Sequence, residues 1–127
     1  MNIVAVGIGG FFGAILRYIV GERLPIVNGF PLGTFMINLL GCLFLGWFLN
    51  IKWWKINPNL KLAIGTGFVG AFTTFSTFSV ETLYLLKNHH FFLALFYVML
   101  SVLGGIGLAA IGAKLASKSV QIEGGKE

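Results

Sequence analysis

Charged side chains are scarce in this chain. They make up 10% of its 127 residues, and hydrophobic residues make up 57%, whereas a soluble domain carries about 25% charged residues. Nine basic and four acidic side chains are too few to coat a compact domain of this size with charge. Together with a mean hydropathy of +0.89, this scarcity argues against a soluble enzyme and a disordered tail, and predicts an integral membrane protein.

Cysteine is almost absent as well. Cys42 is the only one in the sequence, so no disulfide can form within the chain, and a secreted disulfide scaffold is excluded. Because Cys42 lies inside an apolar run, we expect packing there rather than an interchain bridge or a reactive thiol. The N-terminus lacks the charged region and cleavage site of a signal peptide, so its apolar stretch is interpreted as a retained first span.

What the chain does contain is four long apolar runs. A helix rises about 1.5 Å per residue, so about 20 apolar residues cross a hydrocarbon core of about 30 Å. The predicted spans are residues 3–20, 33–51, 62–86 and 91–113, and a polar C-terminal tail occupies residues 114–127. Only helices satisfy their own backbone in lipid. We therefore predict one all-α integral membrane domain over residues 1–127, with four transmembrane helices joined by short loops.

The basic residues form no continuous stripe, so nucleic acid is not an expected partner. They flank the apolar runs, as topology determinants do. Four spans place both termini on one side of the membrane, together with Lys52, Lys55, Lys61, Lys114, Lys118 and Lys126. Arg17, Arg23 and Lys87 fall on the other side. The count favours cytoplasmic termini.

Small residues recur one turn apart within the first and fourth spans. Gly9 and Gly13 are separated by three residues, as are Gly105 and Ala109. This spacing lets helix backbones approach closely in lipid. Packing within one chain accounts for part of it. Because four short helices enclose little space, a pore or cavity needs more than one chain, and we predict an oligomer.

Two polar side chains lie within predicted membrane spans, where an unpaired polar group costs several kcal/mol. Arg17 lies near the end of the first span beside Tyr18; it is either an interfacial anchor or a collector of anions at a pore mouth. Asn38 lies deep in the second span, with no charge nearby. Its amide serves either as a hydrogen bond between helices or as a donor that lines a pore.

The third span contains the most unusual pattern. Three glycines fall within residues 65–70, and a run of five hydroxyl side chains falls within residues 73–79. Glycine loosens a helix, and Ser and Thr compete for backbone carbonyls. We therefore predict a break near the middle of this span. Because non-helical backbone at depth must be buried in protein or line a cavity, freed carbonyls there could coordinate a small cation.

Two stripes run along the same segment at about 100° per residue. Phe72, Phe75 and Phe78 form one of them. The other contains Thr74, Thr77 and Glu81. An aromatic ring has a positive edge, so ring edges beside hydroxyl donors could conduct an anion without a full positive charge. A Phe stripe by itself is more often packing, but the adjacent polar stripe favours a pathway.

The fourth span places Tyr97 and Ser101 one turn apart, on one face. Their hydroxyls could extend the polar stripe of the third span, although Tyr97 alone could also be an interfacial anchor. His89 and His90 lie in a short loop and are interpreted as solvated residues rather than metal ligands.

These segments together resemble the Fluc (CrcB) family of small fluoride channels. The likeness covers essentially the whole chain and rests on residues 9–18 (GGFFGAILRY), 33–41 (GTFMINLLG) and 73–79 (TTFSTFS). The last of these runs is highly specific to the family.

The resemblance implies an antiparallel, dual-topology dimer with two fluoride pores and a central structural sodium ion. In each pore Asn38 would donate a hydrogen bond to the anion, and Phe75 and Phe78 would present ring edges to it. The polar lane would comprise Thr74, Thr77, Glu81, Tyr97 and Ser101. The resemblance places Arg17 in the vestibule and the backbone carbonyls of Gly70 and Thr73 on the sodium ion. Some relatives pair two different subunits, so the partner would be a second copy or a sister chain.

The function expected from this resemblance is a passive fluoride channel in a microbial cytoplasmic membrane, surrounded by lipid. It would let fluoride that enters as HF leave the cell down its gradient, which lowers fluoride toxicity. A small multidrug/proton antiporter shares the four-span dimeric outline, and a non-transporting assembly protein is a third alternative. No nucleophile–base arrangement is visible in the sequence, so we do not expect an enzyme.

Overall fold

A computed structural model of the chain describes residues 2–51 and 57–124. Four of its helical segments are long and apolar enough to cross a membrane: Ile3–Arg23, Leu32–Asn50, Pro58–Lys87 and Phe91–Lys118. The prediction of an all-α protein with four spans is therefore confirmed, and the chain is a multi-pass membrane protein.

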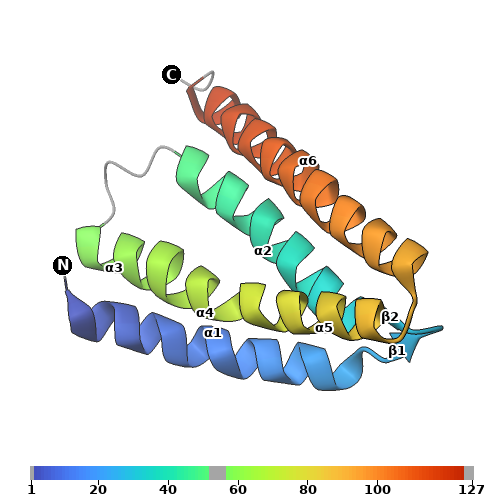
Figure 1. Ribbon diagram of the computed structural model, residues 1–127. Coiled ribbons are helices and arrows are strands. Elements are labelled where there is room, and N and C mark those ends of the chain that lie inside the picture. Colours follow the sequence, from blue (N-terminus) through green and yellow to red (C-terminus); the bar gives the residue numbers. More distant parts are fainter. Residues whose placement is uncertain (1, 52–56, 125–127) are drawn as a thin grey trace.

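The four spans form two packed pairs. Helix α1 (Ile3–Arg23) lies along the third span, and α2 (Leu32–Asn50) packs mainly on α6 (Phe91–Gly124), as Figure 1 shows. The start of α1, the end of α2, the start of the third span and the end of α6 lie at one end of the bundle. The loop between α5 and α6 lies at the other end.

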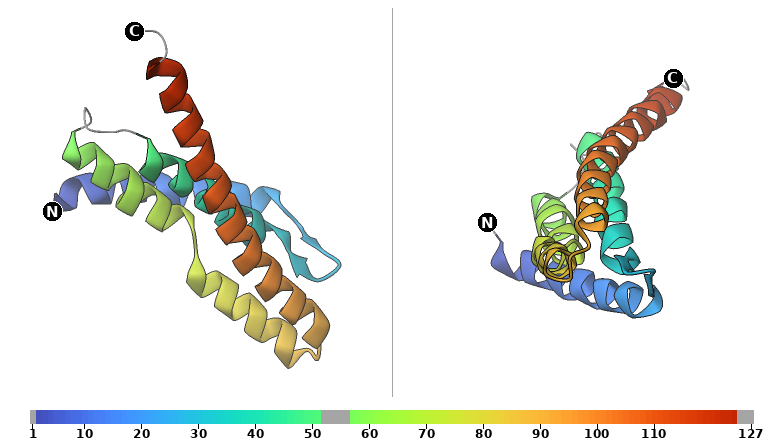
Figure 2. Two further views of the ribbon diagram at one scale, coloured as in Figure 1. Left: turned by 90° about the horizontal axis from the view of Figure 1, so that it is seen from above. Right: turned by 45° about the vertical axis from the view of Figure 1, so that its right-hand side comes forward.

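The third span consists of several helical pieces. In chain order they are α3 (Pro58–Leu62), the π-helix η1 (Ala63–Val69), α4 (Gly70–Phe72) and α5 (Phe75–Lys87). Between α4 and α5, Thr73 and Thr74 have extended backbone, with ψ angles of 158° and 118°. The left view of Figure 2 shows this link. The Thr74 side chain then caps α5 by accepting from the backbone N–H of Thr77.

A short hairpin joins α1 to α2, which the sequence reading did not predict. Its strands are β1 (Ile26–Val27) and β2 (Phe30–Pro31), paired antiparallel. Asn28 and Gly29 have φ angles of 51° and 82°, which suits the two-residue turn favoured by an Asn-Gly pair. The Phe30 ring packs edge-on against Phe35 and Tyr97. The hairpin therefore packs against Tyr97, a buried residue in the first turns of α6.

Helix α6 is longer than expected. It runs from Phe91 to Gly124, a length of 34 residues, and continues through most of the segment predicted as a polar tail. At 1.5 Å per residue it is about 51 Å long, well beyond the about 30 Å of a hydrocarbon core. Its last turns therefore extend past the apolar part of the bundle.

Glycines bring the helices of each pair into backbone contact. A Cβ atom on Gly13 would collide with the carbonyl oxygen of Phe68 in η1, and a Cβ on Gly9 would collide with that of Ala63. Likewise, a Cβ on Gly46 of α2 would collide with the Ala109 carbonyl of α6. The small residues of the first and fourth spans thus serve packing within the chain.

Replacing Gly13 by Ala should lower the stability of the protein by about 1–3 kcal/mol, because α1 must move away from η1. Gly7 on the same helix has open space where its Cβ would be, so Gly7→Ala is the matched control and should leave stability unchanged or slightly higher. Thermal unfolding in detergent measures both. Equal melting temperatures for Gly13→Ala and the wild type would show that this contact is not tight.

Candidate functional site: a groove at the break in the third span

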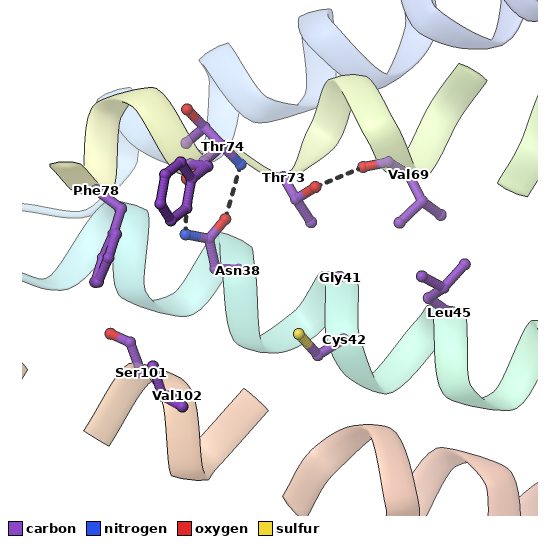
Figure 3. A pocket seen from close by; sticks show the side chains of 11 residues that line it. Asn38, Gly41, Cys42, Leu45, Val69, Thr73, Thr74, Phe78, Ser101 and Val102 are labelled. Atoms are coloured by element: carbon purple, nitrogen blue, oxygen red, sulfur yellow. Dashed lines mark hydrogen bonds between the residues drawn. The ribbon is translucent and has the colours of Figure 1, made fainter. Parts of the chain in front are cut away.

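A groove of about 310 Å³ opens where α2, the α4–α5 break and α6 meet, as Figure 3 shows. Six residues predicted for the pore or the sodium site line it: Asn38, Thr73, Thr74, Phe75, Phe78 and Ser101. The rest of the lining was not predicted and consists of Gly41, Cys42, Leu45, Val69 and Val102. The structure thus gathers residues from three spans around one concavity.

Asn38 holds the break in place. Its Oδ1 accepts from the Thr74 N–H at 2.8 Å, and its Nδ2 donates to the Thr74 carbonyl at 3.0 Å (Figure 3). Because a backbone N–H can only donate, the atom that it contacts must be the oxygen of the Asn38 amide, and the other must be the nitrogen. The second hydrogen on Nδ2 has no acceptor among the described residues. Asn38 therefore links two helices and retains one donor at the groove.

Two carbonyls at the break lose their usual helical donors. In a helix the carbonyl of Gly70 would accept from Thr74 N–H, and the carbonyl of Thr73 would accept from Thr77 N–H. Thr74 N–H donates instead to Asn38, and Thr77 N–H donates to the Thr74 hydroxyl at 3.2 Å. These are the two residues that the resemblance assigns to sodium, and carbonyl oxygens are suitable ligands for a hard cation.

The hydroxyls around the break form a local network. Thr74 is buried, and its Oγ1 donates to Thr77 Oγ1 at 2.9 Å and lies 3.3 Å from Ser76 Oγ. Thr77 itself is exposed on α5 and does not line the groove. The predicted stripe through Thr74 and Thr77 assumed an uninterrupted helix. Because the helix restarts at Phe75, Thr74 is its cap, and the Thr77 N–H donates to the Thr74 hydroxyl.

The Glu81 carboxylate receives one hydroxyl on each oxygen. Thr34 of α2 donates to Oε1, and Tyr97 of α6 donates to Oε2, both at 2.8 Å. Tyr97 is fully buried, and Thr34 is 7% exposed. The structure therefore brings Glu81 and Tyr97, two residues expected in the polar lane, into contact. Neither of them lines the groove. Sequence reasoning missed Thr34, although its position one turn before Asn38 could have placed it on the same face.

The two predicted Phe rings stand beside each other at the groove. The centroids of Phe75 and Phe78 are 5.9 Å apart with planes at 38°. The ring centroids of Phe78 and Tyr97 are 5.1 Å apart. This contact joins the groove to the cluster of Glu81, Thr34 and Tyr97. Phe75 is 80% exposed in the single chain, so much of its ring is available to a ligand, to lipid or to a second subunit.

The remaining predicted residues lie in three places. The Ser101 hydroxyl is buried at the groove and has no hydrogen-bond partner in the described part of the chain. Arg17 is half-buried on α1, away from the groove lining. His89 and His90 are exposed in the loop before α6. Residues 2–51 and 57–124 contain no group of three or more His, Cys, Asp or Glu side chains that could hold a metal ion.

Replacing Tyr97 by Phe should lower the free energy of unfolding by about 1–3 kcal/mol, because Glu81 Oε2 loses its donor inside the protein. Tyr84 on α5 is 66% exposed, and its hydroxyl makes no hydrogen bond among the described residues, so Tyr84→Phe is the control and should be neutral. Thermal unfolding of both variants in detergent gives the comparison. A neutral Tyr97→Phe would mean that water or another donor replaces the hydroxyl.

Known proteins give matches over nearly the whole chain. A family model described as "CrcB-like protein, Camphor Resistance (CrcB)" matches residues 4–113. A "Fluoride-specific ion channel FluC" from Oceanobacillus iheyensis is 50% identical over 117 residues, which cover 91% of each chain. A "Fluoride-specific ion channel FluC 1" from Desulfitobacterium hafniense is 49% identical, over 87% of this chain and 97% of its own.

A third relative has similar coverage. A "Fluoride-specific ion channel FluC" from Methanocaldococcus jannaschii is 43% identical over 116 residues, covering 91% of this chain and 94% of its own. With the four apolar spans and the broken third span, these matches confirm the resemblance noted in the sequence: the chain belongs to the CrcB-like family.

Proposed function

We propose that this protein is a passive fluoride-selective channel of a microbial cytoplasmic membrane, and that it lowers fluoride toxicity by letting the ion leave the cell. The observation that carries the proposal is the groove at the break. Among the described residues, it presents an amide hydrogen of Asn38 and a Ser101 hydroxyl that have no acceptor or donor partner, together with two Phe rings and no charged lining side chain. Relatives of up to 50% identity are named fluoride-specific channels.

The chemistry of these groups suits a small, strongly hydrated anion. Each neutral donor replaces part of the water shell, and none binds so tightly that the ion cannot leave. Phe75 and Phe78 supply the positive edges of their rings. Glu81 does not compete for these donors, since Thr34 and Tyr97 already satisfy both of its oxygens. A dehydrated fluoride ion would thus move from hydroxyl and amide donors to ring edges along one lane.

A second subunit would complete the pathway. The groove is open along one side, and Phe75 at its rim is 80% exposed. We propose that an antiparallel second copy, or a sister chain, covers this side and forms two pores with it. Arg17 would then lie in a vestibule. The polar lane would include Thr74, Thr77, Glu81, Tyr97 and Ser101.

We propose a structural sodium ion at the break. The carbonyls of Gly70 and Thr73 fit it because both lose their helical donors to side-chain capping. Two such carbonyls from each of two subunits would supply four oxygen ligands. Replacing sodium by a large organic cation during purification should then lower both the dimer fraction and fluoride efflux. A dimer that conducts normally without sodium would contradict the site.

Fluoride efflux from liposomes that contain only this purified chain tests the function. Efflux under a fluoride gradient is expected, with chloride retained. A small multidrug antiporter would instead exchange organic cations for protons, and an assembly protein would move neither. Glu81 argues against the antiporter, because such coupling needs a carboxylate free to release its proton, and both Glu81 oxygens accept hydroxyls. Failure of the single chain, with recovery on adding a sister chain, would indicate a heterodimer.

A further inference from the structure

A second groove lies at the end of the bundle where both termini are found. It has a volume of about 460 Å³ and runs between the last turns of α2 and the start of the third span. Leu45, Leu49, Pro58 and Leu62 form apolar walls, and Gly65 also lines the groove, where a Cβ would lie 3.4 Å from the Phe48 ring. Leu45 is the one lining residue that it shares with the groove at the break.

Two polar groups interrupt this apolar lining, and neither has a partner among residues 2–51 and 57–124. Lys61 is exposed, and its ammonium forms no ion pair with the described residues. Thr66 is exposed as well, and its hydroxyl has no hydrogen bond in the described part of the chain. By contrast, the hydroxyls of Thr73, Ser79 and Thr82 each donate to the carbonyl four residues earlier. Thr66 lies in the π-helix η1, where the backbone pairs with a different spacing.

The polar and apolar groups of this groove suit the two parts of an anionic lipid. Lys61 lies nearer the start of the third span than Thr66 does. Thr66 lies five residues further along the span, in the π-helix η1, and Leu62 and Gly65 lie between the two. The walls formed by Leu45 and Leu62 are apolar. A cation at the end of a membrane span, beside apolar walls, suits a phosphate head group with its acyl chain.

We propose that this groove binds one anionic phospholipid. The Lys61 ammonium contacts the phosphate, the Thr66 hydroxyl donates to an ester carbonyl, and one acyl chain lies over Gly65 between α2 and the third span. Charge complementarity favours an anionic lipid, since the exposed residues Lys61, Lys114 and Lys118 all lie toward this end of the bundle. Because the binding involves neither fluoride nor the groove at the break, the proposal does not depend on the proposed function.

Retention of lipid by the purified protein tests the proposal. The chain is reconstituted in vesicles of equal parts phosphatidylglycerol and phosphatidylcholine and extracted into mild detergent. The bound lipid is then counted by mass spectrometry. We expect phosphatidylglycerol to be retained preferentially. Lys61→Gln should lower the ratio of the two lipids about fivefold, the effect of one interfacial lysine. Gly65→Leu should displace both lipids, because the new side chain fills the groove.

Lys118→Gln is the matched control. Lys118 is an exposed lysine of α6 at the same end of the bundle, outside the groove, and its loss should leave the ratio unchanged. An equal fall for Lys118→Gln would show diffuse attraction to the surface and overturn the site. So would equal retention of both lipids by the wild type, or release of the bound lipid by millimolar fluoride. A change of oligomeric mass in Gly65→Leu without lipid loss would assign the groove to a second copy.

Discussion

Replacing Asn38 by Asp should reduce fluoride efflux from liposomes about 100-fold or more. The Asn38 amide accepts from the Thr74 N–H and donates to the Thr74 carbonyl. Aspartate keeps the first bond but places a second carboxylate oxygen against that carbonyl. It also adds a negative charge beside the proposed path of an anion. A loss of about 3 kcal/mol from these effects corresponds to about 100-fold in rate.

Asn50→Asp is the matched control for this experiment. Asn50 lies on the same helix, is exposed, and donates to the carbonyl of Gly46 at the end of α2. The same change there should leave efflux within about twofold of the wild type, because an exposed hydrogen bond contributes about 1 kcal/mol or less. Size-exclusion chromatography establishes that both variants keep the assembly of the wild type. Wild-type efflux in an intact Asn38→Asp protein would remove Asn38 from the pathway.

Replacing Phe78 by Ile should lower efflux about tenfold, and Phe75→Ile should act in the same direction. Isoleucine fills a similar space but has no positive ring edge. If an anion loses about 1.4 kcal/mol of stabilisation in the pathway, throughput falls about tenfold. Phe78 also contacts Tyr97, so its replacement removes one wall beside the Glu81 cluster.

Phe92→Ile is the corresponding control. Phe92 is 90% exposed on α6 and does not line the groove. Its replacement should leave efflux unchanged, while thermal unfolding of all three variants separates a loss of conduction from a loss of stability. If Phe75→Ile and Phe78→Ile conduct at the wild-type rate, the two rings serve packing alone.

The four spans could be predicted because a membrane imposes a simple requirement on composition and length. The residues around the groove could be predicted because polar groups inside apolar runs are costly and therefore few, as with Asn38 and Ser101. Both arguments use local sequence. They identify which residues are unusual, but they do not say which partner each residue finds.

The partners depend on packing between distant segments. A helical wheel placed Thr77 beside Thr74 on one stripe, and the two hydroxyls are in contact, but it did not show that the helix restarts at Phe75 with Thr74 as its cap. Thr34 reaches Glu81 from a position 47 residues earlier, and no local pattern marks that pair. The hairpin at Ile26–Pro31 was missed because its strands of two residues each are too short to show an alternating pattern.

The π-helix Ala63–Val69 has a consequence for how the chain tolerates changes in length. A π-helix contains more residues than an α-helix of the same length, so this stretch has more backbone than an α-helix would need to cover the same distance. Deleting one residue from it can be absorbed by tightening to α geometry, and Lys61 and Thr73 keep their orientation. The same deletion within α5 would rotate every later side chain by about 100°. Natural variation in span length is therefore expected to concentrate before the break.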